Sequence, residues 1–250
     1  MAQLNGSRYR SPNIRVGCCG FPVRKAIYYR SLSVVEVQRT FYQLPELSTA
    51  RRWKEEAPSD FEFTLKAWQL ITHEPSSPTY RRLQMDIPED KKKYYGFFKA
   101  TEEVEAAWLK TAEFARVLGA KKIVFQCPAS FRPTDEHHRN LRQFFKRTSR
   151  GSFAFVWEPR GHWPREEVER LCVEFDLLTC VDPFKWVPAP GCLPYLRLHG
   201  RTGYRYKYSD EDMRGLVASL EGFPQVYVMF NNISMYDDAL RFKKFCEIHP

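Results

Sequence analysis

The sequence has no long apolar run, no cysteine pair with the spacing of a metal or redox motif, and few histidines. It contains no run of about 18 apolar residues, the length a membrane-spanning helix needs, so we predict that membranes are not among its partners. No Cys-x-x-Cys pair occurs, which argues against a zinc ribbon or a thioredoxin-type redox site. Only six histidines occur, whereas a multinuclear metal centre needs many histidine and carboxylate ligands.

The cysteines that are present are typical of a reducing compartment. There are seven, an odd number at irregular spacing, and Cys127 and Cys180 lie within apolar segments, where cysteine acts as a small hydrophobe. Cys18 and Cys19 are adjacent and point to opposite faces if their segment is a strand, so they are not expected to form a disulfide. The first ten residues lack the apolar core of a signal peptide. We therefore expect a cytoplasmic protein.

The charge balance favours anionic partners. Hydrophobic residues make up 43% of the chain and charged residues 28%, which is a globular composition. The formal net charge is +9, and this favours binding of nucleic acid, nucleotides or phosphorylated metabolites. A basic protein without any specific anionic ligand fits the same numbers.

Short apolar segments alternate with amphipathic ones along the chain. Strands are predicted at 14–20, 34–38, 61–68, 122–128, 153–160, 177–182, 193–200 and 225–232, and the main helices at 47–57, 101–118, 135–150, 164–175, 210–220 and 236–248. Strands that alternate with helices form a parallel sheet, and eight such units in 250 residues predict a closed (β/α)8 barrel of the TIM type, in the α/β class. An open doubly wound sheet is the alternative.

No change in composition divides the chain into two domains. Residues 74–100 are proline-rich and too poor in apolar residues for a core of their own, so we predict an insertion on the barrel rim. We expect a single barrel domain over 13–250 and a flexible arm over 1–12.

Polar residues gather at the carboxyl ends of the predicted strands. In the segment 193–200, a period of two places Arg197 and His199 on one face. The sites of TIM-type barrels lie where the strands end, so these side chains are expected to form one site. The set comprises Glu36, Lys66, Gln126, Glu158, Arg160, Asp182, Arg197, His199 and Asn232.

These residue types suggest specific roles. Arg160 and Arg197 are predicted to hold a phosphate or a carboxylate through their guanidinium forks. Lys66 is interpreted as a base of lowered pKa, as a Schiff-base amine, or as a simple counter-ion. Catalytic proton transfer is assigned to Glu158, Asp182 and His199, which are also the ligands expected for a single Mg²⁺ or Mn²⁺ ion if the protein uses one.

A structural role for the same charges is the alternative. Buried charges usually occur in pairs, so Glu158–Arg160 and Asp182–Arg197 could instead be internal ion pairs that set the strand register.

Basic and aromatic residues alternate in three segments that we expect on the rim, at 24–30, 91–99 and 201–207. Basic groups neutralise phosphates and aromatic rings stack on bases, so Tyr204 joins the ligand-binding candidates. His73, in the loop after the third strand, is another. The charges of 135–150, including His137 and His138, are expected to form a solvated outer face.

Several short motifs resemble one family. In order they are 34–42, 61–67, 71–73, Phe125-Gln126-Cys127-Pro128, Trp157-Glu158-Pro159-Arg160, Leu196-Arg197-Leu198-His199-Gly200 and Phe230-Asn231-Asn232. They resemble family 72 of the domains of unknown function, also called the YecE-like family, over residues 14–246. The resemblance implies an irregular (β/α) barrel similar to those of endonuclease IV and xylose isomerase, without a settled activity.

The chain departs from this family's usual pattern near two strand ends. It has Gln38-Arg39 where the family more often has Asn-Ser, and Arg160-Gly161-His162 in place of an Arg-His pair. The run Cys18-Cys19-Gly20-Phe21 resembles an archaeal branch.

Three functions remain open at this point. The first is an enzyme, using metal-assisted or acid–base hydrolase or lyase chemistry on a phosphate-bearing or nucleic-acid-derived substrate. The second is a nucleic-acid-binding protein without catalysis. The third, a sugar isomerase or hydrolase, rests on fold analogy alone.

Overall fold

The computed structural model describes residues 13–186 and 193–248, and in this part of the chain eight parallel strands close into a barrel. They are β1 (Asn13–Cys19), β2 (Val34–Val37), β3 (Glu62–Lys66), β4 (Lys122–Gln126), β5 (Ala154–Glu158), β6 (Leu178–Val181), β7 (Tyr195–Leu198) and β8 (Gln225–Phe230). Pairing of β8 with β1, from Asn13 beside Gln225 to Cys18 beside Phe230, completes the ring. The predicted barrel is confirmed and the open sheet is wrong. The predicted arm, 1–12, lies outside the described residues.

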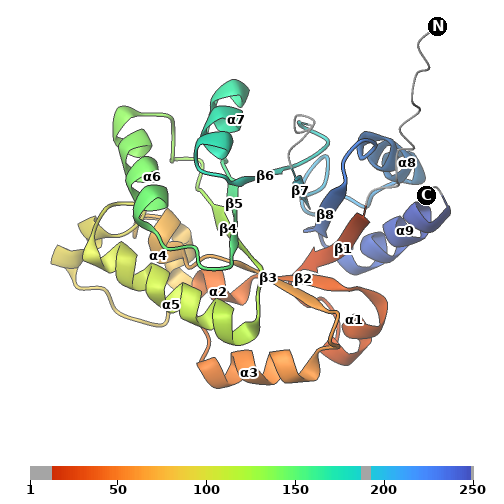
Figure 1. Ribbon diagram of the computed structural model, residues 1–250, viewed down its shortest axis with the longest axis horizontal. Helices are drawn as coiled ribbons and strands as arrows, with labels where there is room; N and C mark the ends of the chain where they lie inside the picture. Colours follow the sequence, from red (N-terminus) through yellow and green to blue (C-terminus); the bar gives the residue numbers. More distant parts are fainter. Residues whose placement is uncertain (1–12, 187–192, 249–250) are drawn as a thin grey trace, which may run out of the picture.

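Helices surround the strands, as Figure 1 shows. They are α1 (Lys25–Ser31), α2 (Arg39–Tyr42), α3 (Leu47–Glu56), α4 (Gln69–Thr72), α5 (Glu102–Leu118), α6 (Asp135–Arg147), α7 (Arg165–Glu174), α8 (Asp210–Ser219) and α9 (Met235–Ile248). The closing helix α9 lies beside β1, so the two ends of the fold meet (Figure 1). None of the described helices is both long and apolar enough to span a bilayer.

The segment 24–30, predicted as an aromatic and basic rim loop, is mostly the helix α1. Tyr28 is fully buried. Its hydroxyl accepts from the Cys18 backbone nitrogen at 2.7 Å and donates to the Val34 carbonyl oxygen at 2.8 Å. Tyr28 therefore joins β1 to β2 and offers no ring to a ligand.

The insertion 74–100 contains two 3₁₀ helices, η1 (Pro78–Arg82) and η2 (Glu89–Tyr94), and returns to the barrel at its end. The Phe98 backbone nitrogen donates to the Ile71 oxygen at 2.9 Å. The buried Phe98 ring packs against rings from β4 and α6, Phe125 and Phe144, at centroid distances of 6.1 and 5.2 Å. The insertion is thus fastened to the core by an aromatic side chain.

Helix α6 is less solvated than its sequence indicates. Most of its charges are exposed or only partly buried, but His137 is buried, 4.6 Å from the Phe131 ring in a stacked arrangement, with Nδ1 2.7 Å from the Arg132 oxygen. The expectation of a fully solvated histidine there was wrong. The reason is that His137 packs against Phe131, in the loop after β4, and against Phe97, in the insertion, and these rings cover it from water.

The barrel interior is layered, because alternate residues of each strand point inward. The middle layer is mostly apolar and includes Val34, Val124, Val156 and Tyr195. At the amino end, Lys122 Nζ lies 2.8 Å from Glu62 Oε1 and 2.7 Å from the Tyr227 hydroxyl. The carboxyl end carries the residues of the predicted site. Cys18 and Cys19 point outward and inward respectively, as expected.

Replacing Phe98 with Ala should lower the free energy of unfolding by about 3–5 kcal/mol, because it leaves a cavity among packed rings. Urea unfolding monitored by circular dichroism measures this. Met85→Ala, at a 40% exposed position of the same insertion, should change it by less than about 0.5 kcal/mol. Equal effects of the two substitutions would show that the insertion is not fastened through Phe98.

Candidate functional site

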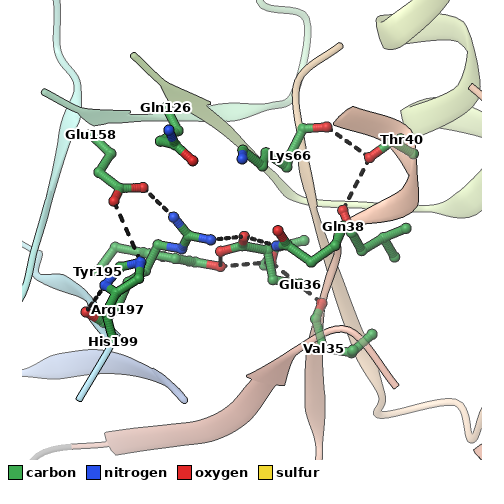
Figure 2. A network of polar contacts seen from close by, with 12 residues as sticks. Val35, Glu36, Gln38, Thr40, Lys66, Gln126, Glu158, Tyr195, Arg197 and His199 are labelled. Atoms are coloured by element: carbon green, nitrogen blue, oxygen red, sulfur yellow. Dashed lines mark hydrogen bonds and ion pairs between the residues drawn. The ribbon is translucent and has the colours of Figure 1, made fainter. Parts of the chain in front are cut away.

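Arg197 occupies the centre of the carboxyl end of the barrel and is only 1% exposed. Its Nη2 atom lies 3.1 Å from Glu36 Oε1, and its Nη1 atom donates to Glu158 (Figure 2). One guanidinium from β7 is therefore held between a carboxylate of β2 and a carboxylate of β5. The predicted pair Asp182–Arg197 is wrong, because Asp182 follows β6 and accepts from the Phe184 backbone nitrogen at 3.1 Å instead.

Glu158 has a second arginine partner. Arg160 donates from Nε to Glu158 Oε1 at 2.9 Å, so the predicted pairing of these two residues is confirmed. Burial raises the pKa of Glu158, but Arg197 and Arg160 outweigh it and hold the pKa at about 2. Glu158 is therefore an anion throughout the physiological range and cannot supply a proton there.

His199 is neutral and bonded at both ring nitrogens. Nδ1 lies 3.0 Å from the Arg197 carbonyl oxygen, and Nε2 lies 2.6 Å from Arg160 Nη2. The carbonyl requires a donor at Nδ1, so Nε2 accepts from the guanidinium. Burial and then Arg197 lower the pKa of His199 to about 4. In this arrangement His199 orients Arg160 and has no free lone pair for a substrate proton.

Glu36 is satisfied by several donors. Besides Arg197, it accepts from the Tyr195 hydroxyl at 2.9 Å and from the Gln38 amide. The Tyr195 hydroxyl also lies 2.8 Å from Thr64 Oγ1. Sequence reasoning did not single out Tyr195 or Thr64, although the period of two places Tyr195 on the same face as Arg197, and Thr64 on the same face as Lys66.

Lys66 differs from the other charged residues at this end of the barrel. It is 6% exposed, and its Nζ atom lies 3.5 Å from the centroid of the Phe41 ring. Among the described residues it has no carboxylate within ion-pair distance, and in Figure 2 its nitrogen points towards the Gln126 side chain. Burial, followed by the charge of Arg197, lowers the pKa of Lys66 to about 7.

Two uncharged polar side chains, His73 and Gln126, lie near Lys66 together with the Phe41 ring. His73 is 3% exposed, lies 4.9 Å from the Phe41 ring centroid edge-to-face, and places Nδ1 2.8 Å from Thr72 Oγ1. Burial and then Lys66 lower the pKa of His73 to about 3. Gln126, 7% exposed, donates to the Cys127 oxygen at 3.1 Å. Burial and the positive charge of Arg197 favour the neutral form of the Lys66 amine, and they outweigh the carboxylates of Glu158 and Glu36, which act in the opposite direction.

Three predicted site residues lie apart from this cluster. Asn232 is buried and donates to the Tyr206 oxygen and to Asp238 Oδ2, each at 2.7 Å, so it fastens the loop after β7 to α9. Tyr204 lies in that loop and is 54% exposed. Asp182 caps a turn after β6, and burial raises its pKa.

The residues proposed as ligands for Mg²⁺ or Mn²⁺ do not fit that role. Both oxygens of Glu158 accept from arginines and Nε2 of His199 accepts from Arg160, so these lone pairs are engaged with cations. No group of three histidine, cysteine or acidic side chains suited to a metal occurs among the described residues. The cluster is a neutralised charge network with one additional amine.

Replacing Arg197 with Met should lower the free energy of unfolding at pH 7 by about 3–5 kcal/mol, because two buried carboxylates lose their shared partner. The loss should shrink as the pH falls, since the unpaired carboxyls then take up protons on folding. Urea unfolding at pH 7 and pH 5 measures both effects. Arg142→Met removes a partly exposed partner of Glu174 and should cost less than about 1 kcal/mol. A pH-independent loss for the Arg197 variant would contradict this account.

Solved structures with the same fold share little sequence with this chain. A DUF72 family protein from Enterococcus faecalis is 21% identical, with a TM-score of 0.72 over 94% of this chain and 98% of that one. A DUF72 family protein from Thermotoga maritima is also 21% identical, with a TM-score of 0.65 over 94% and 99%. Endonuclease IV from Thermus thermophilus is 13% identical, with a TM-score of 0.53 over 96% and 100%. At these identities the similarity shows the fold alone.

The family model settles the relationship that the sequence motifs suggested. No curated protein matches the chain. The expected archaeal branch stays a prediction. The model described as "Protein of unknown function DUF72" matches residues 24–248, and the chain therefore belongs to the DUF72 family.

Proposed function

We propose that this protein is an enzyme that acts on a phosphate-bearing substrate at the carboxyl end of its barrel, with Lys66 as the group that accepts and returns a proton. The observation that carries the proposal is a buried lysine amine with no carboxylate partner among the described residues and a pKa of about 7. A general base is most effective when its pKa lies near the working pH.

The balance of charge at the site assigns this role to Lys66 and not to its neighbours. The carboxylates of Glu36 and Glu158 are matched by the guanidiniums of Arg197 and Arg160. His73 and His199 are neutral, with pKa values of about 3 and 4. Of these site residues, Lys66 is the one whose pKa lies near neutral pH. An anion bound beside it would favour its protonated form.

The position of Lys66 is defined by the strand that carries it. Thr40 donates from Oγ1 to the Lys66 carbonyl oxygen at 2.7 Å, which fixes the end of β3 under α2. The Phe41 ring lies against the ammonium and attracts its charged form, although burial still dominates. The free amine can accept a proton from a substrate atom that binds above it and can later return the proton.

Arg160 is the residue best placed to hold the phosphate. Its side chain is 39% exposed, and its Nε and Nη2 atoms bond to Glu158 and His199, which fixes the plane of the guanidinium. Its Nη1 atom has no partner among the described residues, and it can donate to a phosphate oxygen. Arg197, expected to share this role, is enclosed by its two carboxylates and is a structural residue here.

The lysine can be tested without knowing the substrate. After reductive methylation with ¹³C-formaldehyde, one dimethyl-lysine resonance should titrate near pH 7 and be missing in Lys66→Met, while exposed lysines titrate near 10. Adding inorganic phosphate should raise the midpoint of that resonance, because a nearby anion stabilises the ammonium. Lys146→Met, at an exposed position of α6, should remove only a resonance of the ordinary kind.

Two results of this titration would contradict the proposal. A spectrum in which every lysine resonance titrates above about pH 9 would remove the proposed base. A near-neutral midpoint that phosphate does not move would exclude the assigned class of substrate.

The lowered pKa of Lys66 should also make the free energy of unfolding depend on pH. The folded-state pKa of Lys66 lies below its unfolded value, so the unfolded chain binds more protons between about pH 7 and 10.5, and stability rises with pH in this window. Relative to Lys66→Met, the free energy of unfolding of the parent protein should rise by up to about 1.4 kcal/mol per pH unit. Urea unfolding at pH 7 and 9.5 measures this, with Lys146→Met as the control. A difference that does not vary with pH would show an ordinary pKa.

A further inference from the structure

The loop between β7 and α8, residues 199–209, continues directly from Arg197 and is held rigidly. The Gly200 backbone nitrogen donates to the Tyr208 hydroxyl at 2.8 Å, and the Tyr206 hydroxyl donates to Asp212 Oδ2 at 2.6 Å. The Tyr208 ring is buried and stacked on Phe184 at 5.4 Å. Two of the three tyrosines thus point into the protein and anchor the loop.

Residues that follow β8 and a residue of α9 fasten the same loop. Asn232 donates from Nδ2 to the Tyr206 oxygen at 2.7 Å, and Arg241 donates from Nη1 to the Tyr208 oxygen at 2.7 Å. The Ile233 backbone nitrogen donates to the Tyr204 oxygen at 2.9 Å. Binding to this loop would therefore cost little ordering entropy.

The remaining side chains of the loop are turned to solvent. Tyr204 is 54% exposed, and its bonded neighbour Ile233 is 59% exposed. Arg205 and Lys207 are also exposed, and neither has a carboxylate partner among the described residues. By contrast Arg201, in the same loop, lies 2.8 Å from Asp212 Oδ1. The exposed side chains of this loop thus include an aromatic ring and two cations without a carboxylate partner among the described residues, and the exposed Ile233 is bonded to the loop.

We propose that Tyr204, Arg205, Lys207 and Ile233 form a binding platform for single-stranded nucleic acid. A base would stack on the Tyr204 ring beside Ile233, and Arg205 and Lys207 would neutralise the adjoining phosphates. An exposed aromatic ring beside the cations distinguishes this surface from the charged face of α6, where Arg139, Lys146 and Arg147 are exposed but no described aromatic residue of the helix is.

If the platform binds the substrate of the enzyme, that substrate is a single-stranded nucleic acid, and this part of the inference rests on the proposed function. The connection is strand β7, which carries Arg197 in the site and leads directly into the loop. A strand held by the loop would present a phosphate to the carboxyl end of the barrel. Binding itself requires no reaction, so it can be measured separately from the role of Lys66.

The test is fluorescence anisotropy with a labelled single-stranded oligonucleotide of about 10 nucleotides at low salt. Tyr204→Ala should weaken binding about tenfold, whereas Tyr204→Phe should retain it, because stacking needs the ring and not the hydroxyl. Arg205→Ala and Lys207→Ala should each reduce the slope of log affinity against log salt by about 1. An unlabelled duplex should compete less well, since its bases are already stacked.

Matched variants distinguish binding at the platform from binding that depends only on net charge. Lys146→Ala removes one positive charge from α6 and should bind as the parent does; weakening equal to that of Lys207→Ala would overturn the proposal, because binding would then follow net charge. Unchanged affinity in Tyr204→Ala, or equal competition by a duplex, would also overturn it. Anisotropy reports binding of the oligonucleotide, whereas the near-neutral lysine resonance reports Lys66 in the free protein, so failure of the platform and failure of the proposed base are distinguishable.

Discussion

A positive charge enclosed at the centre of a closed barrel has to be neutralised from inside, because almost no water reaches it. Arg197 meets this constraint through Glu36 on β2 and Glu158 on β5. Burying three charged groups is costly unless each finds its partners. Their pairing therefore holds three strands in one register, since a slip of a single residue would turn these side chains into the apolar layer under the helices.

The same constraint shapes the chemistry of the site. Both carboxylates are committed to guanidiniums, and both histidines are neutral in their surroundings. Lys66 shares the burial but has no carboxylate partner among the described residues, so the cost of its charge appears as a lowered pKa. A network in which both carboxylates are paired thus leaves the Lys66 amine with a pKa near neutrality, and such perturbed pKa values are common at functional sites.

The sequence predicted the architecture well and the contacts within the site only in part. The period of two and the regular alternation with helices are local signals, and they led to the barrel and to Lys66, Glu158 and Arg197 at one end of it. Which carboxylates meet Arg197 depends on how the ring closes, and Tyr195 and Glu36 are 159 positions apart. Asn232 lies beyond the last paired residue of β8, where the alternation no longer applies. Tyr28 resembled a rim residue because its neighbours are basic, but its hydroxyl bridges two strands.

The pairing of Arg197 across the barrel also bears on how such a chain could reach its native state. The first four strands carry Glu36 and Lys66, and the last four carry Glu158 and Arg197. A half-barrel made of β1–β4 would hold a carboxylate without its guanidinium, and at its amino end the Glu62–Lys122 pair would lack the Tyr227 hydroxyl. The pairing of Glu158 with Arg197 and Arg160 lies within the second half, but Glu36 reaches Arg197 only across the two halves, so closure of the ring and neutralisation of Glu36 coincide.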